Sequence, residues 1–196
     1  MSEHTGRFLM VRHGRTTANA AGILMGRTDA PLLPDSLAHA AELGRTLALT
    51  SSTVLYSSDQ PRALRTAHLI GHPSALQPIP DPRLRERHFG TYTLDAFTDL
   101  AHDPAWPAID TRYDSRPHHG ETLREVEQRI FTRLLQLHRA HSPDITLVVI
   151  GHSTCWRLVQ AALCRRRHDP FDEPIPPPLT VLPHARAALA GLHDYL

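Results

Sequence analysis

Two apolar runs in this chain each end in a histidine that is followed by a helix-compatible stretch. Residues 8–11 lead through an arginine into His13, and residues 147–150 lead through a glycine into His152. Both segments predict a strand, then a histidine, then a helix. In an open α/β sheet the ligand crevice lies just beyond the carboxyl ends of the parallel strands. We therefore expect the two histidines to face each other across a single pocket.

Strand-like and helix-like segments alternate along the chain, which predicts an α/β fold with a parallel sheet. The 196 residues suit one domain with a substantial core, taken here as residues 1–196. Residues 185–192 fit a helix by propensity and also fit a last strand. The predicted strands are 7–12, 53–56, 77–79, 145–150 and an edge strand at 179–182. The predicted helices are 14–21, 35–49, 60–70, 121–139 and 153–166, with Asp35 and residues 57–59 as N-caps.

The stretch from residue 81 to residue 120 has no strong periodicity, apart from short helices expected near 94–101. A segment of this length is more often a functional lid or loop region than a core element. We therefore expect a substrate-specificity or lid insertion at about 87–120. The candidates for substrate contact are Tyr92, Trp106, Arg112, Tyr113 and Arg116, which also fit ordinary packing and surface positions.

All 21 basic residues are arginine, and the chain has no lysine. A GC-rich genome is the simplest explanation. The chemical consequence is that lysine Schiff bases and P-loop lysines are excluded, so any anion site must use the planar guanidinium group. The net charge of +1 gives no case for nucleic-acid binding.

Several features predict a cytoplasmic protein without membrane contact. No run approaches the ~18 apolar residues of a membrane span, and the first residues lack a signal-peptide pattern. Cys155 and Cys164 lie too far apart along one predicted helix to form a disulfide, and reduced cysteines fit the cytosol. A homodimer is left open.

Charged and hydrogen-bonding groups gather around the first histidine. Arg12 supplies a fixed positive charge, and Gly14 lets the backbone turn tightly against a ligand at the start of a helix. Thr16 and Asn19 supply neutral hydrogen-bonding groups one turn further on. Together these residues predict an oxyanion pocket around an imidazole. The alternative is a core histidine at a strand end, followed by an ordinary helix cap.

Arg62 stands one turn into the helix that follows strand 53–56. Most arginines on helices are solvated, so this position is a weak signal by itself. If strand 53–56 neighbours strand 7–12, however, Arg62 can point into the same crevice as His13.

Six blocks in the same order resemble the histidine phosphatase superfamily, the phosphoglycerate mutase-like proteins. They lie at 12–19, 26–32, 56–67, 84–90, 120–122 and 150–157. The resemblance covers about residues 7–160 and is specific because all six blocks are present. It implies a three-layer α/β/α fold with a mostly parallel sheet, and an enzyme of the phosphatase branch that uses no metal or other cofactor.

The resemblance also implies the roles of individual residues. His13 is expected to be the nucleophile that attacks phosphorus and forms a phosphohistidine. The residues expected to surround the phosphoryl oxygens are Arg12, Arg62 and His152, with Thr16, Asn19 and the backbone N–H of Ser153 as neutral groups. Such charge stabilisation and positioning are the main sources of catalysis in phosphoryl transfer.

Glu86 is expected, on the same resemblance, to protonate the leaving alkoxide and then to activate water as a base. Without the family context it reads as a surface carboxylate paired with Arg85 or Arg87. The chain departs from the family in Ser153-Thr154, where two glycines are frequent, and in Arg15, where many relatives carry Glu or Gln. Neither departure removes a proposed catalytic group.

Three functions are compatible with these residues. The first is a phosphomonoesterase acting on a small phosphorylated metabolite. The second is a phosphoglycerate mutase-type phosphoryl transferase, which the short chain, its proline-broken C-terminal part and the absence of lysine disfavour. The third is a non-catalytic phosphate-binding protein. No metal is expected, because His118, His119 and His168 match no ligand spacing and read as solvated loop residues.

Overall fold

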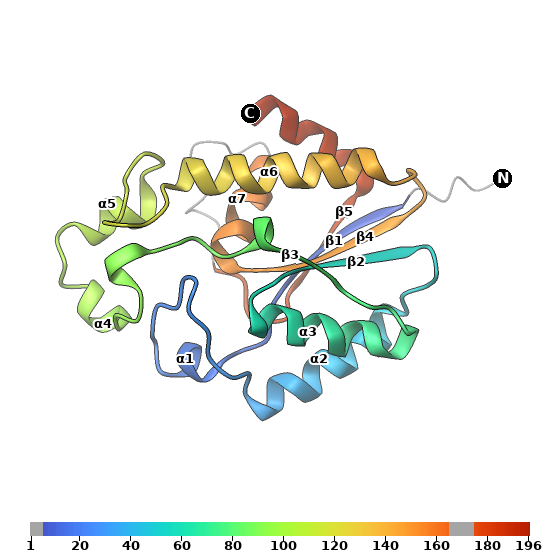
Figure 1. Cartoon of the computed structure of the whole chain (residues 1–196), viewed down its shortest axis with the longest axis horizontal. Helices are drawn as coiled ribbons and strands as arrows, with labels where there is room; N and C mark the ends of the chain where they lie inside the picture. The colour runs from blue at the N-terminus through green and yellow to red at the C-terminus, as the bar shows by residue number, and fades with distance from the viewer. Residues whose placement is uncertain (1–5, 165–174) are drawn as a thin grey trace.

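The computed structural model describes residues 6–164 and 175–196, which include a five-stranded sheet in the order β3-β2-β4-β1-β5 (Figure 1). Strands β1 to β4 are parallel, and β5 pairs with β1 in the antiparallel direction. The strands are β1 Arg7–Arg12, β2 Thr53–Ser58, β3 Ile79–Asp81, β4 Thr146–Gly151 and β5 Val181–Ala185. The predicted mostly parallel sheet is confirmed, although β3 and β5 each begin two residues later than expected.

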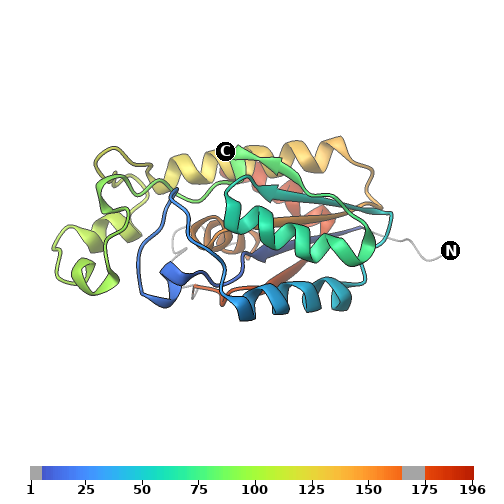
Figure 2. The same ribbon diagram turned by 60° about the horizontal axis from the view of Figure 1, so that its bottom comes forward.

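Helices cover both faces of the sheet and give the three expected layers (Figure 1 and Figure 2). The α-helices are α1 Thr17–Ala20, α2 Pro34–Leu47, α3 Pro61–Gly71, α4 Phe97–Leu100, α5 Trp106–Thr111, α6 Leu123–Ala140 and α7 Ser153–Leu163. The 3₁₀ helices are η1 His72–Ser74, η2 Pro82–Leu84, η3 Gly90–Tyr92 and η4 Arg186–Tyr195. Of the residues 185–192, which fitted a helix or a strand, Ala185 ends β5 and the others belong to η4. The predicted end of the helix after His152, at residues 165 and 166, lies outside the described residues.

The apolar runs of β1 and β4 are continuous because both faces of the sheet are buried. Side chains alternate along a strand, so Phe8 and Met10 pack toward α6, α7 and η4. Leu9 and Val11 pack on the other face, with the apolar sides of α2 and α3. This packing fixes the direction in which β1 ends.

The predicted N-caps of α2 and α3 are wrong. Helix α2 begins at Pro34 with Leu33 as its N-cap, so Asp35 lies inside the first turn. Helix α3 begins at Pro61 with Gln60 as its N-cap, because β2 continues through Ser58. In both helices proline occupies the first position, where its fixed φ favours the helix and its missing N–H costs nothing, so a capping side chain is not required.

The register of β1 and β4 brings the two histidines together. Arg12 pairs with Gly151, so His13 and His152 leave neighbouring strand ends at the same level. The segment that carries α4 and α5 lies beyond these carboxyl ends (Figure 1). Strand β2 pairs with β4 and not with β1, so the condition under which Arg62 was expected to reach the crevice is not met. No helix in the described parts of the chain is long and apolar enough to cross a membrane.

Candidate active site

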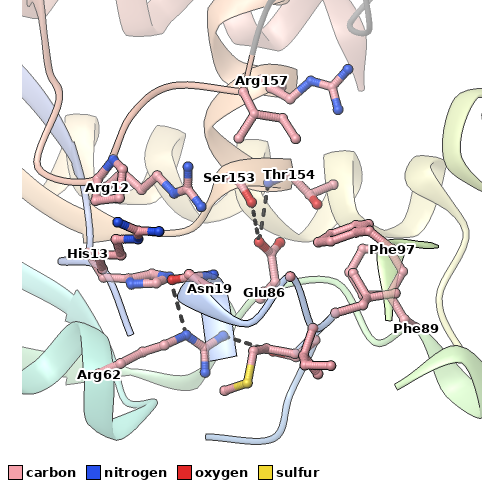
Figure 3. A pocket seen from close by; sticks show the side chains of 18 of the residues that line it. Arg12, His13, Asn19, Arg62, Glu86, Phe89, Phe97, Ser153, Thr154 and Arg157 are labelled. Carbon is pink, nitrogen blue, oxygen red and sulfur yellow. Dashed lines mark hydrogen bonds between the residues drawn. The ribbon is translucent and has the colours of Figure 1, made fainter. Parts of the chain in front are cut away.

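A cavity of about 500 Å³ lies at the carboxyl ends of the parallel strands, as the sheet topology predicts (Figure 3). Its lining includes the predicted site residues Arg12, His13, Asn19, Arg62, Glu86 and Ser153. His152 is fully buried beside His13, with 5.2 Å between the ring centroids, but it is not itself part of the lining.

The hydrogen bonds of His13 define which of its nitrogens is free. Nδ1 lies 2.7 Å from the carbonyl oxygen of Gly14, which can only accept, so Nδ1 carries the proton. Nε2 accepts a 3.2 Å hydrogen bond from Nε of Arg62. The nitrogen with a lone pair available for nucleophilic attack is therefore Nε2, and this lone pair points toward Arg62.

His152 has the opposite tautomer. Its Nδ1 lies 3.3 Å from Nη2 of Arg62, and because a guanidinium group only donates, this nitrogen must be the acceptor. The neutral ring then carries its proton on Nε2, which is buried and has no hydrogen-bond partner in the structure. His152 is thus a hydrogen-bond donor without an acceptor.

Both rings are neutral at pH 7. Burial lowers the pKa of His13 to about 3, and the nearby charge of Arg62 acts in the same direction. Burial also lowers the pKa of His152 well below its ordinary value, with Arg62 again contributing. A neutral His13 keeps the lone pair that nucleophilic attack requires.

Arg62 is only 2% exposed, and several hydrogen bonds fix the position of its guanidinium group. Its guanidinium group donates to the carbonyl oxygens of Gly26 and Thr28 at 2.8 and 2.6 Å and to Asp29 at 3.0 Å. These contacts, rather than a neighbouring strand, place Arg62 between the two histidines. It reaches them even though β4 separates β2 from β1.

Arg12 supplies the second guanidinium group. One of its terminal nitrogens donates to the carbonyl oxygen of Pro176, while Nε is buried without a partner. A buried donor that lacks a partner costs about 1–3 kcal/mol, so two such atoms at one site, on Arg12 and His152, indicate a place for an anion.

Thr16 and Gly14 have roles other than those predicted. Thr16 is fully buried and forms a capping box with Asn19, donating to its side-chain oxygen at 3.0 Å. This contact leaves the NH₂ group of Asn19 for the cavity, so Thr16 positions Asn19. Gly14 packs closely on α2, since a Cβ atom there would lie 3.1 Å from the Cβ of Ser36 and would force a small shift. Helix α1 has only four residues, so it provides no helix N-terminus for an anion.

Glu86 is only 5% exposed and faces the start of α7. Oε2 accepts hydrogen bonds from the hydroxyl of Ser153 at 3.1 Å and from the backbone N–H of Thr154 at 3.3 Å (Figure 3). Oε1 accepts one from the N–H of Arg87 at 2.8 Å. The surface-carboxylate alternative is therefore wrong. The side chain of Ser153, a departure from the family pattern, contacts the proposed acid directly.

The two arginines that flank Glu86 hold other parts of the site. Arg85 forms an ion pair with Asp59. Arg87 is fully buried and donates to the carbonyl oxygens of Ile109, Ser115 and Glu121, which ties the segment 87–120 together. No sequence pattern indicated this role for Arg87.

Sequence reasoning also missed three polar residues of the site. Gln60 accepts from the N–H of Glu86 at 2.8 Å and donates to the carbonyl oxygen of Gly26 at 3.1 Å, so it joins two walls of the cavity. Asp110 of α5 and Arg157 of α7 both line the cavity. No sequence pattern distinguishes a buried glutamine such as Gln60 from an exposed one. Arg157 could have been found, because it lies within the family-like block 150–157.

Of the five substrate-contact candidates, only Trp106 lines the cavity. Tyr92 packs against Trp106, with 5.4 Å between centroids, and Tyr113 packs against the main core. Arg112 is exposed, and Arg116 forms an ion pair with Glu125. Besides Trp106, the apolar side chains of the lining come from three segments, and they are Ile23, Leu24, Met25, Phe89, Phe97, Ile175 and Pro178.

Within the described ranges, no group of three or more His, Cys, Asp or Glu side chains is arranged to hold a metal ion. His118 and His119 lie against each other with 3.8 Å between ring centroids, and His168 lies outside the described residues. Cys155 and Cys164 are both free thiols.

The neutral histidines predict a loss of stability in acid. The unfolded chain protonates His13 near pH 6.5, whereas the folded protein does so only near pH 3. The unfolded state therefore binds more protons below pH 6.5, and the free energy of unfolding falls by about 1.4 kcal/mol per pH unit for this group. Urea unfolding of wild type and His13→Asn between pH 7 and pH 5 should show a steeper decline for wild type. Equal slopes would contradict a neutral His13.

The chain is similar to known proteins. The family model described as "Histidine phosphatase superfamily (branch 1)" matches residues 8–181. A glucosyl-3-phosphoglycerate phosphatase of Mycolicibacterium vanbaalenii is 33% identical over 168 residues, which are 80% of this chain and 73% of that protein. A Serratia proteamaculans protein named a probable phosphoglycerate mutase is 32% identical over 124 residues, 62% of this chain and 58% of that protein. The structure of a mycobacterial glucosyl-3-phosphoglycerate phosphatase has a TM-score of 0.82 at 24% identity, covering 91% of this chain and 92% of that one, and it shares the fold.

Proposed function

Because the chain belongs to the histidine phosphatase superfamily (branch 1), we propose that it hydrolyses a small phosphorylated metabolite through a phosphohistidine on His13. The observation that supports this proposal is that two neutral histidines of opposite tautomer both accept a hydrogen bond from Arg62. One ring offers a lone pair and the other offers an unpartnered N–H, side by side and next to a buried carboxylate.

In the first step, Nε2 of His13 attacks phosphorus, the N–P bond forms and the bond from phosphorus to the alcohol oxygen breaks. Arg62 transfers its hydrogen bond from Nε2 to a phosphoryl oxygen. The unpaired donors of Arg12 and His152 bind the remaining charge, together with the NH₂ group of Asn19. The leaving alkoxide takes a proton from Glu86, so the alcohol departs neutral.

In the second step, water enters where the alcohol has left, and Glu86, now a carboxylate, removes one of its protons. The water oxygen forms a bond to phosphorus as the N–P bond breaks, and His13 and inorganic phosphate are regenerated. Ser153 suits this alternation, because a hydroxyl donates to a carboxylate and accepts from a carboxylic acid, whereas a backbone N–H only donates.

We extend the proposal to the rest of the chain. Residues 87–120 act as a lid and specificity insertion of one domain spanning residues 1–196, supported by the position of α4 and α5 at the cavity. The two free cysteines support a cytoplasmic location. Small phosphorylated metabolites, and not nucleic acids or membranes, are the partners. A homodimer stays a prediction, which sedimentation of the purified protein tests.

The function is tested by phosphate release from a panel of aryl and alkyl phosphates in the presence of a chelator. We expect release of inorganic phosphate from several esters at rates that added Mg²⁺ or Zn²⁺ does not raise. Transfer of the phosphoryl group between two positions of phosphoglycerate without phosphate release would favour the mutase alternative. Absence of any turnover would favour the non-catalytic alternative.

A further inference from the structure

The cavity has a second, apolar end that phosphoryl chemistry does not explain. Figure 3 shows Glu86 between the cluster of His13, Arg12 and Arg62 and the two side chains of Phe89 and Phe97. The proposed acid must stand beside the oxygen of the leaving alcohol. The part of the cavity beyond Glu86 is therefore where the alcohol portion of the substrate lies.

The apolar wall at this end, formed by Phe89, Phe97 and Trp106, is largely preformed. Phe89 packs with Leu24 and Leu100 in a small cluster of its own, to which Tyr92 and Trp106 add their rings. The ring centroids of Phe89 and Trp106 are 6.1 Å apart. Because these side chains are held by one another, the apolar surface they present to the cavity does not have to form when a ligand binds.

Two apolar side chains at the cavity remain exposed to water. Phe97 of α4 is 45% exposed and Ile175 is 54% exposed, and both belong to the cavity lining. Large apolar side chains exposed at a cavity are suited to contact with a ligand. An apolar alcohol beyond Glu86 would remove Phe97 from water.

The charges at this end offset each other. Asp110 of α5 and Arg157 of α7 line the same cavity, and each favours the charged state of the other. The negative charge of Asp110 therefore weakens the attraction of Arg157 for a carboxylate of a substrate. Arg15 also lines the cavity, but it is exposed to solvent, which screens its charge.

We propose that the physiological substrate is a phosphomonoester of an apolar alcohol, without a carboxylate or a second phosphate on the alcohol. The alcohol portion lies against Phe89, Phe97 and Trp106 while the phosphoryl group lies at His13. The cavity of about 500 Å³ has the volume of on the order of sixteen water molecules, which leaves room for a bulky alcohol beside the phosphoryl group. This inference rests on the proposed phosphatase function.

The test compares esters with the same leaving-group chemistry. Hexyl and ethyl phosphate both release a primary alkoxide and differ by four methylene groups, each of which favours binding about fourfold when it is fully removed from water. The upper limit is about 200-fold, and because the cavity is open to solvent we expect kcat/KM for hexyl phosphate to exceed that for ethyl phosphate at least tenfold. We also expect hexyl phosphate to be preferred over phosphoserine and 3-phosphoglycerate.

Variants test whether this apolar wall causes the preference for hexyl phosphate over ethyl phosphate. Phe97→Ala should lower the hexyl-to-ethyl ratio severalfold. Ile79→Ala is the matched control, since Ile79 is 44% exposed but lies on β3 outside the cavity lining, and it should leave the ratio unchanged. Asp110→Asn removes the charge that offsets Arg157 and should raise the rate with 3-phosphoglycerate relative to hexyl phosphate.

The inference and the function fail in different ways. If no ester releases phosphate, the function is wrong. If esters are hydrolysed but the hexyl-to-ethyl ratio is near one, or a carboxylate-bearing ester is preferred, the function stands and the apolar substrate is wrong. A ratio that Phe97→Ala and Ile79→Ala leave equally unchanged would contradict the role of this wall.

Discussion

Replacing His13 by alanine should lower kcat/KM for every phosphate ester by roughly 10⁴-fold or more. The variant loses the imidazole nitrogen that faces the cavity, and His152 cannot take over the attack. The ring of His152 is not part of the cavity lining, and its Nε2 carries a proton. The measurement is phosphate release from an aryl phosphate, whose good leaving group makes residual activity easiest to detect.

The control is His68→Ala, which removes an exposed histidine of α3 and should leave kcat/KM unchanged. Binding of inorganic phosphate to His13→Ala should persist, since Arg12, Arg62 and His152 remain. A His13→Ala protein that keeps activity within about tenfold of wild type while folding normally would exclude His13 as the nucleophile.

Glu86→Gln should slow alkyl phosphates by about 10³-fold and aryl phosphates by about tenfold or less in kcat/KM. An alkoxide is a strong base and leaves only with a proton, whereas a nitrophenolate leaves without one. The amide keeps the size of the side chain but cannot donate an acidic proton. Because kcat/KM reports only the steps up to departure of the alcohol, slow hydrolysis of the phosphoenzyme does not enter this comparison.

Variants of Ser153 should change the rates of alkyl and aryl phosphates in the same direction as Glu86→Gln, but by a smaller factor. Ser153→Ala removes the 3.1 Å hydrogen bond to Glu86 and should widen the difference between alkyl and aryl phosphates, though less than Glu86→Gln does. Ser153→Thr keeps a hydroxyl and should restore most of the alkyl activity. Equal slowing of alkyl and aryl esters in Glu86→Gln would refute the acid role, and with it the positioning role of Ser153.

The proximity of His13 and His152 could be predicted from the sequence because the residues just before each histidine are sufficient for the prediction. Each histidine follows a continuous apolar run, which is typical of a strand buried on both faces, and parallel strands end on the same side of the sheet. Arg62 was expected to reach His13 on the condition that β2 neighbours β1, and it reaches His13 although β4 lies between these strands. Backbone carbonyl oxygens of Gly26 and Thr28 position it, and sequence patterns do not show where such oxygens lie.

The side chains of segment 87–120 that line the cavity could not be predicted in the same way. Aromatic residues in a long irregular segment look alike in the sequence, and only the folded structure separates Phe97, which lines the cavity, from Tyr113, which packs on the core. The hydroxyl of Ser153 could not be assigned either. It departs from the family pattern, and its contact with Glu86 joins residues that are 67 positions apart.

The central claim is that the phosphoryl group passes through His13. The most direct measurement is to mix Glu86→Gln, in which water is not activated, with an aryl phosphate, quench in alkali and digest the protein for mass spectrometry. Phosphohistidine survives alkali, so the account predicts one phosphoryl group on the peptide that contains His13 and none on the same peptide from the double variant with His13→Ala. A phosphoryl group on another residue, or alcohol release without any phosphorylated peptide, would contradict the account.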